Sequence, residues 1–211
     1  MRTMILLSAI GLFCVAGPIP GGVQAQEKKA TEPAKQPSKA EKDEMMKKWM
    51  EVSSPGEAHK RLNDLVGTWT TESRIWMEGP GSQPTLTKGM AEYKWILGGR
   101  FLQQDLQGEM MGMPMTGIGF TGYDNFNKKY IGTWIDDSGT AMYTMEGTAD
   151  QTGKVITLYG KMDESMTGER DKTVKYVFRI LDKDKHVFEI HDLSIGEAST
   201  KVVEMTYTRK K

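Results

Sequence analysis

From Thr68 to Arg209, the chain alternates between short runs rich in Thr, Tyr, Trp, Val, Ile and Met and clusters of Gly, Asp, Asn and Pro. Runs of that kind, bounded by turn-forming residues, predict β-strands. Most of the connections are short, so consecutive strands should be antiparallel neighbours. We expect about ten strands, near residues 68–78, 85–97, 100–109, 113–123, 128–136, 140–149, 154–162, 172–181, 186–192 and 199–209.

About ten antiparallel strands without intervening helices can form a two-sheet sandwich or an up-and-down barrel. Hairpin-length links favour a meander that closes on itself, because closure removes the exposed edge strands. No internal repeat is evident in the sequence, which argues against a propeller. We therefore predict an all-β fold, an antiparallel up-and-down barrel spanning residues 54–211.

The residues of a single strand face are mixed in character in the expected strand 68–78. Its members are Trp69, Thr71, Ser73, Ile75 and Met77. A face that combines hydroxyls with large apolar side chains suits the wall of a partly polar cavity better than a dry core. The pattern therefore predicts a pocket inside the barrel.

Before the strands, the apolar residues recur with a helical period. Met45/Trp49 and Met46/Met50 are i,i+4 pairs, so residues 41–53 predict a short amphipathic helix. This helix could dock on the barrel, touch a membrane surface or meet a partner, and docking is the favoured interpretation. A capping box that begins at Ser54 predicts a second short helix, which Gly67 would end.

The N-terminal residues read as a targeting signal. Arg2 is the only charge in residues 1–25, and an apolar run over residues 4–16 precedes a small-residue cleavage site at Ala25. We expect a cleavable signal peptide over residues 1–25 and export to the periplasm or outside the cell. The run is shorter than the roughly 20 residues of a bilayer span, so the mature chain should have no transmembrane segment; a retained anchor is the alternative. Residues 26–40 have few apolar side chains and predict a disordered linker.

Charge and cysteine usage narrow the classes of partner and chemistry. The 28 basic and 28 acidic residues balance, which argues against a nucleic-acid partner. The single cysteine, Cys14, lies in the expected signal peptide. The mature chain should therefore have no disulfide, thiol nucleophile or cysteine-based metal site, and we expect no cofactor.

Two motifs at opposite ends of the barrel carry a resemblance to known folds. Gly67-Thr68-Trp69 at a helix-to-strand entry resembles the signature of the calycins, which include lipocalins and fatty-acid-binding proteins. The resemblance implies that an arginine of the last strand, here Arg209, packs across Trp69 in a cation–π contact worth about 0.5–2 kcal/mol. Gly67, Trp69 and Arg209 would thus close a lipocalin-like barrel.

A second resemblance covers most of the expected barrel. The segments PGEAHKRLNDLVGTW, YKWILGGRFL, GEMMGMPMTGIGFTGYDNFNKKYIGTWIDDSGT and VVEMTYTR are similar to the domain-of-unknown-function family 1579, from about Ser54 to Arg209. The family comprises exported and soluble bacterial proteins. The resemblance implies a lipocalin-like barrel but no known activity or catalytic residue.

Histidine and carboxylate residues offer few catalytic arrangements. His186 and His191 are in one expected strand but point to opposite faces, so they cannot be paired ligands, and no zinc site is expected. Glu189 and His191 share a face and would be an acid–base pair if that face were interior. The favoured alternative is a pair of charged side chains on the solvent-facing side of an antiparallel barrel. Asp136 and Asp137 are adjacent in a strand and point to opposite faces. We therefore expect them to form hydrogen bonds within the following turn or to bind a cation weakly and non-specifically.

Methionine is concentrated in residues 110–115, which include Met110, Met111, Met113 and Met115. Thioether clusters can bind Cu(I) in an oxidising compartment. Methionine is foremost an adaptable apolar residue, so core or pocket lining is the favoured interpretation.

Three functions remain open from the sequence. The first is a non-enzymatic barrel that binds a small, mostly apolar or amphipathic molecule. The second is an enzyme that uses Glu189 and His191 in the same cavity, and the third is an interaction module in which the 41–50 helix makes the contact and the barrel is packed solid. For the first we expect Arg100 to anchor an anionic group. The full set of expected lining residues is Tyr93, Trp95, Arg100, Gln104, Met115 and Trp134.

Overall fold

The computed structural model describes residues 36–164, 167–196 and 200–211. The expected signal peptide, residues 1–25, and most of the expected linker, residues 26–40, lie outside the described residues. The helices and strands below all belong to one compact unit, Lys39–Lys211.

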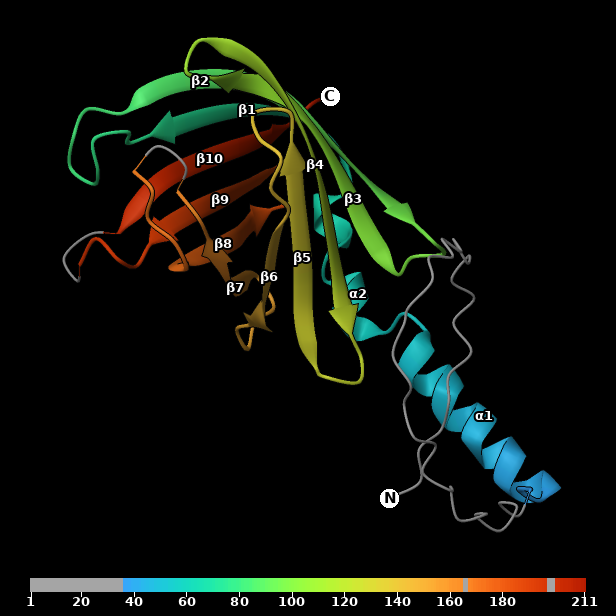
Figure 1. Cartoon of the computed structure of the whole chain (residues 1–211). Coiled ribbons are helices and arrows are strands. Elements are labelled where there is room, and N and C mark those ends of the chain that lie inside the picture. Colours follow the sequence, from blue (N-terminus) through green and yellow to red (C-terminus); the bar gives the residue numbers. More distant parts are fainter. Residues whose placement is uncertain (1–35, 165–166, 197–199) are drawn as a thin grey trace, which may run out of the picture. The chain divides into compact units, whose positions relative to one another are not determined.

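Ten antiparallel strands close into a barrel in which each strand pairs with the next along the chain and β1 pairs with β10 (Figure 1). This order confirms the predicted meander over the two-sheet alternative. The strands are β1 (Gly67–Ile75), β2 (Thr85–Ile96), β3 (Phe101–Met110), β4 (Met113–Asp124), β5 (Lys129–Asp136), β6 (Tyr143–Ala149), β7 (Val155–Met162), β8 (Lys172–Asp182), β9 (Lys185–Asp192) and β10 (Lys201–Arg209).

The hairpin between β3 and β4 shows how turn residues set the register. Met110 pairs with Met113, which leaves a two-residue loop of Met111 and Gly112. Both loop residues have positive φ, 53° and 80°. Positive φ at both positions is the requirement of the tight turn whose twist matches the flanking strands.

The N-terminal helices differ from the prediction in two respects. Helix α1 (Lys39–Ser53) begins two residues before the expected start, and the expected second helix is split into α2 (Glu57–Lys60) and the 3-10 turn η1 (Asn63–Leu65). The cap is Gly56, rather than Ser54, and its N–H donates to Nδ1 of His59 at 3.1 Å. None of these helices, in the part of the chain that is described, has the length and apolar character needed to cross a bilayer.

The apolar side of α1 does not dock on the barrel. Met45, Met46, Trp49 and Met50 are between 43% and 61% exposed, and α1 contains no buried residue. Near its C-terminal end the helix is tied to the barrel, where Asn125 donates from Nδ2 to the carbonyl oxygen of Val52 at 3.1 Å. The docking prediction is therefore wrong for this face of the helix.

One end of the barrel, which we call the closed end, is filled by η1 and Arg209. The guanidinium of Arg209 lies 4.1 Å from the Trp69 ring and donates to the carbonyl oxygens of Val66 at 2.7 Å and Asp64 at 2.8 Å. Trp69 is fully buried and donates from Nε1 to the carbonyl oxygen of Leu65 at 2.8 Å. The contact expected from the calycin resemblance is thus present.

Gly67 is required where the chain enters β1. Its φ is 127°, and a Cβ atom there would lie 2.5 Å from Nη1 of Arg209. A side chain at this position would be strained by its backbone conformation and would displace the guanidinium as well.

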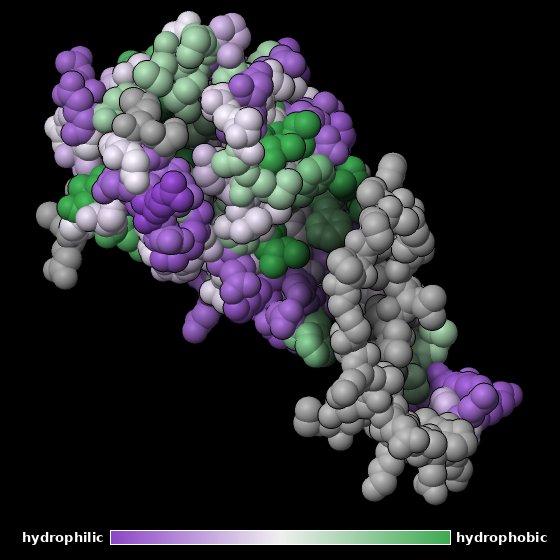
Figure 2. Space-filling view, in the orientation of Figure 1, coloured by the Kyte–Doolittle hydropathy of each residue, from purple (hydrophilic) through white to green (hydrophobic). Residues whose placement is uncertain are grey.

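Side chains alternate between the barrel interior and the outside along each strand. In β9, His186 is buried in the interior, and Phe188 and Ile190 follow on the same face. His191 falls on the opposite face, as predicted. On the visible outer surface, hydrophilic and hydrophobic residues are intermixed (Figure 2).

Candidate functional site

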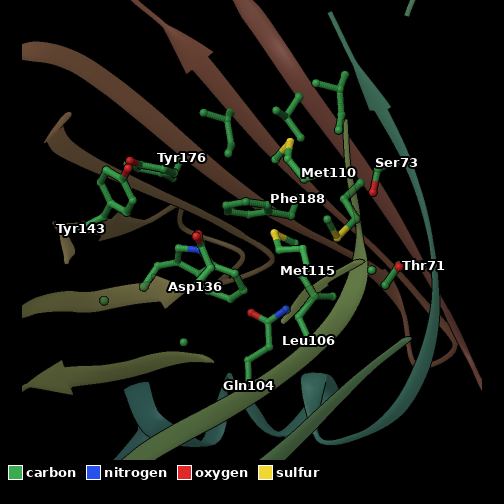
Figure 3. Close-up of a pocket in the computed structure, with 18 of the residues that line it drawn as sticks. Thr71, Ser73, Gln104, Leu106, Met110, Met115, Asp136, Tyr143, Tyr176 and Phe188 are labelled. Atoms are coloured by element: carbon green, nitrogen blue, oxygen red, sulfur yellow. The ribbon is translucent and has the colours of Figure 1, made fainter. Parts of the chain in front are cut away.

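A cavity of about 290 Å³ occupies the half of the barrel away from the closed end. It reaches the β3–β4 hairpin at Met110 and the last residue of β5, Asp136. Figure 3 shows the lining side chains converging on this space from strands on all sides. An engineered apolar cavity of about 150 Å³ is enough to hold benzene, so this volume suits a single-ring or short-chain molecule.

Glycines in β4 make room for an aromatic side chain in the wall. A Cβ atom at Gly117 would lie 2.1 Å from the Trp134 ring, and one at Gly119 would lie 3.1 Å from it. Trp134, in β5, therefore lies flat against the β4 backbone. The glycines of β4 at positions 117 and 119 therefore serve close packing against this ring.

Thioethers and aromatic rings make up most of the apolar lining. The methionines that face the cavity are Met110, Met115, Met145, Met162 and Met205, and Phe178 and Phe188 lie among them. Met111 and Met113 of the same hairpin are 57% and 63% exposed. The four hairpin thioethers are therefore divided between cavity and solvent. No group of three or more His, Cys, Asp or Glu in the described ranges could hold a metal ion.

One wall of the cavity carries hydroxyl groups. Thr71 and Ser73 of β1 and Thr87 of β2 are buried and line the space. None of the three side chains forms a hydrogen bond with another residue that the structure describes. An occupant could satisfy these hydroxyls, which is how a mostly apolar site fixes the orientation of a ligand.

The floor of the cavity, on the side of the closed end, is formed by polar groups that rest on a layer of aromatic rings. Gln104 donates from Nε2 to the Tyr207 hydroxyl at 3.0 Å. Tyr207 stacks on His186 with ring centroids 4.1 Å apart, and burial raises the pKa of Tyr207 to about 12. Burial, and to a smaller extent the charge of Arg209, lowers the pKa of His186 to about 3. Both groups are therefore neutral at physiological pH.

The wall opposite the hydroxyls carries a carboxylate and two phenols (Figure 3). Asp136 accepts a hydrogen bond from Nε1 of Trp134 at 2.7 Å and another from the N–H of Ser138 at 3.0 Å. Tyr143 and Tyr176 lie beside it. Burial raises the pKa of Tyr176 to about 12, and the nearby Tyr143 adds to the shift.

Comparison with known proteins gives a family. The sequence model described as "Protein of unknown function (DUF1579)" matches residues 54–209, which is most of the chain. The chain belongs to the DUF1579 family. No curated protein matches this DUF1579 chain in sequence.

Solved structures resemble the DUF1579 barrel in fold. The crystal structure of Rv2717c from M. tuberculosis is 18% identical and covers 75% of this chain and 100% of its own, with a TM-score of 0.55. At that identity the likeness shows a shared barrel fold. Two redesigned β-barrels are more distant. The barrel b11L5F_LGL is 13% identical and covers 75% of this chain and 99% of its own. The barrel mFAP0, bound to DFHBI, is 12% identical and covers 69% of this chain and 99% of its own. Each has a TM-score of 0.39.

Of the expected lining residues, Gln104, Met115 and Trp134 line the cavity of the DUF1579 barrel. Tyr93 points inward but lies below the cavity, buried against His186 and Tyr207. Its assignment to the lining is wrong, because its place along the barrel axis is too close to the closed end.

Trp95 and Arg100 are also outside the cavity. Trp95 donates from Nε1 to Oδ1 of Asn63 in η1 at 2.9 Å, so it packs at the closed end. Arg100 is exposed and donates from Nε to the carbonyl oxygen of Ser53 at 3.0 Å. Arg100 therefore ties α1 to the β2–β3 hairpin, and the prediction that it anchors an anion in the cavity is wrong.

Glu189 and His191 lie on the outer face of β9. Glu189 accepts from Nε of Arg179 at 3.0 Å and from Nζ of Lys201 at 3.2 Å, and His191 lies 3.5 Å from it. Burial raises the pKa of Glu189, but the hydrogen bonds and charges of Arg179 and Lys201 outweigh burial and leave the pKa below its usual value. The pair therefore lies away from the cavity and cannot act in it. Its outward direction agrees with the favoured alternative, but Glu189 is only 8% exposed and is not open to solvent as expected.

The sequence interpretation missed the carboxylate and phenols of the cavity wall. Asp136 is two residues beyond Trp134 in β5, so the two share a strand face. This spacing could have been used to predict that Asp136 lines the cavity together with Trp134. Tyr143 of β6 is paired across from Trp134 of β5, and Tyr176 reaches the same wall from β8. Their meeting depends on the register between these strands, which the sequence pattern does not give.

Proposed function

We propose that this DUF1579 barrel binds a small, mostly apolar molecule in its cavity and does so without catalysing a reaction. The observation that carries the proposal is the cavity of about 290 Å³. Its size is near the lower end of the about 300–1,000 Å³ typical of small-molecule sites. A barrel filled by its own side chains would have supported the interaction-module hypothesis instead.

The lining chemistry supports the same proposal. Methionine side chains are unbranched and polarisable, so a wall that contains Met115, Met145 and Met205 can adapt to the shape of an occupant. The unpartnered hydroxyls of Thr71 and Ser73 supply a few polar contacts. Glu189 and His191, the acid–base pair considered for an enzyme, lie on the outer face of β9 and away from the cavity, which favours binding over catalysis.

Native mass spectrometry of the full chain purified from its own host tests the proposal. We expect a stoichiometric non-covalent adduct of a small molecule that is released on unfolding. A clean mass for the protein alone, together with no binding of any probe of suitable size, would overturn the ligand-binding proposal.

We further propose that the protein is exported, on the strength of the charge and apolar pattern of residues 1–25. Fractionation of the host followed by mass spectrometry of the N-terminus tests this. The expected product begins at Gln26 and is found outside the cytoplasm, whereas an intact N-terminus in the cytoplasm would contradict export.

The exposed apolar side of α1 favours a second candidate function, contact with a partner through this helix. Trp49 is 61% exposed and Met46 57% exposed. A double substitution, Met46→Glu with Trp49→Glu, should abolish such a contact in co-purification from the host while leaving the barrel folded. An unchanged set of co-purifying proteins would remove this candidate.

A further inference from the structure

The cavity contains a carboxylate, that of Asp136, and its negative charge indicates the chemical class of the occupant more narrowly than the shape of the cavity does. Asp136 lines the cavity, and its carboxylate accepts hydrogen bonds from Nε1 of Trp134 and from the N–H and Oγ of Ser138. All three donors are neutral. An ionised carboxylate has about four acceptor positions, so a further donor can be accommodated.

Among the described residues, no lysine or arginine forms an ion pair with Asp136. Among the residues that the structure describes, Lys88 is the one basic residue at the edge of the cavity. Its side chain is exposed, and its Nζ lies 3.8 Å from Oε1 of Glu72 on the outer face. Lys172, near the same end of the barrel, bonds to Asp192 at 2.6 Å and Glu169 at 3.1 Å and does not line the cavity.

Other groups at this wall reinforce the negative potential. Burial raises the pKa of the Tyr143 phenol, and the carboxylates of Asp136, Glu164 and Asp163 raise it further. Glu109, which is exposed, also borders the cavity. A cation is therefore favoured here, and a carboxylate or phosphate ligand would be repelled.

Aromatic rings stand beside the carboxylate. Figure 3 shows Asp136, Tyr143 and Tyr176 on one side of the cavity, with Phe188 and Met115 between them and the hydroxyl wall. The faces of aromatic rings attract organic cations, and a carboxylate beside two phenols offers an ammonium group both charge and π contacts.

We propose that the occupant of the cavity is a small organic amine, whose ammonium group pairs with Asp136 and whose apolar part lies against Phe188 and the methionines. The proposal rests on the ligand-binding function and names its chemical class. The apolar part is small, because the cavity volume is only about 290 Å³.

Three probes of nearly equal shape but different charge test the proposal by isothermal titration calorimetry. They are phenethylamine, which is cationic at neutral pH, phenethyl alcohol, which is neutral, and hydrocinnamate, which is anionic. For the unmodified protein we expect phenethylamine to bind about tenfold or more tightly than phenethyl alcohol, since a hydrogen bond to a charged group contributes about that factor. Hydrocinnamate should bind most weakly.

Two matched variants locate the effect. Asp136→Asn should abolish the preference for the amine while leaving the affinity for the alcohol within about twofold, because the cavity shape is retained. Asp137→Asn removes the same charge one residue further along, outside the lining, and should keep the preference.

The possible outcomes separate the two proposals. If the alcohol binds but hydrocinnamate binds as tightly as the amine, or if the amine preference survives Asp136→Asn, the amine inference is wrong and the ligand-binding proposal stands. If none of the three probes binds the unmodified protein, the amine inference is wrong, and native mass spectrometry of the protein from its host decides the ligand-binding proposal separately. Should Asp136→Asn not fold, the ranking of the three probes on the unmodified protein still decides between amine and acid.

Discussion

The guanidinium of Arg209 lies 4.1 Å from the ring of Trp69, joining the last strand of the barrel to the first. The same guanidinium donates to main-chain carbonyl oxygens of Val66, Asp64 and Lys183. One side chain therefore satisfies three acceptors that the end of η1 and the β8–β9 turn would otherwise leave unpaired. This arrangement makes the closed end a structural element rather than a binding site.

Substituting Arg209 with Ala should destabilise the barrel. The change removes the cation–π contact and three hydrogen bonds, so we expect the free energy of unfolding to fall by about 2–4 kcal/mol. For a chain of this size each kcal/mol corresponds to about 2–4 °C in Tm, which thermal denaturation followed by circular dichroism can measure. Arg74→Ala is the control, because Arg74 is an exposed partner of Glu204 and should change Tm little. Equal effects of the two substitutions would contradict the closure role of Arg209.

Substituting Gly67 with Ala should also destabilise the closed end. The methyl group would meet Nη1 of Arg209 at 2.5 Å, at a backbone φ of 127°. We expect a loss of about 1–3 kcal/mol in urea denaturation, the usual cost of a non-glycine residue in such a conformation. Gly139→Ala provides the comparison, since a Cβ atom there has nothing within 4 Å. If Gly67→Ala unfolds at the same urea concentration as Gly139→Ala, the close approach of Arg209 to Gly67 does not contribute to the stability of the barrel.

The strands of the barrel could be predicted from the sequence because the turn residues that bound each strand are a local signal. The closure by Gly67, Trp69 and Arg209 joins the two ends of the meander and was implied by the resemblance to the calycins. The lining was less accessible, since alternation gives the face of a residue but not its depth along the barrel axis. Tyr93 and Gln104 are paired across β2 and β3 and both point inward, yet only Gln104 reaches the cavity.

The outward direction of Glu189, which was the favoured alternative, has a signal in its own strand. The other face of β9 carries Phe188 and Ile190, which are the more apolar residues and belong inside. The splitting of the helix after Ser54 has no comparable signal. It depends on Leu62 and Leu65, both of which are buried at the closed end, and that packing exists only once the barrel has formed.

His186 should make stability depend on pH. Its side chain is 1% exposed, and neither ring nitrogen has a hydrogen-bond partner in the described part of the chain. The pKa is lowered from 6.5 to about 3 in the folded protein, so the unfolded chain binds a proton that the folded protein excludes. Stability should therefore fall as the pH drops below about 6.5, by at most about 1.4 kcal/mol per pH unit, until about pH 3.

Comparison with His186→Phe isolates this effect. Phenylalanine keeps the stacking on Tyr207 and removes two unpartnered polar atoms, so the variant should be at least as stable as the unmodified protein at pH 7. At pH 4.5 its advantage should be larger by roughly 2–3 kcal/mol in urea denaturation. Parallel pH profiles for the two proteins would show that His186 is not the group responsible.

Gly108 offers a way to fill the cavity without disturbing the fold. It lines the cavity from β3, its φ is not in the left-handed region, and a Cβ atom there would meet nothing within 4 Å. Gly108→Leu should therefore fold normally and place its side chain in the space meant for the ligand. We expect the small-molecule adduct seen by native mass spectrometry to be lost, with Tm unchanged or raised, because leucine is better suited to a strand than glycine. Gly139→Leu makes the same change outside the lining and should retain the adduct, whereas an adduct that persists in Gly108→Leu must be bound elsewhere on the protein.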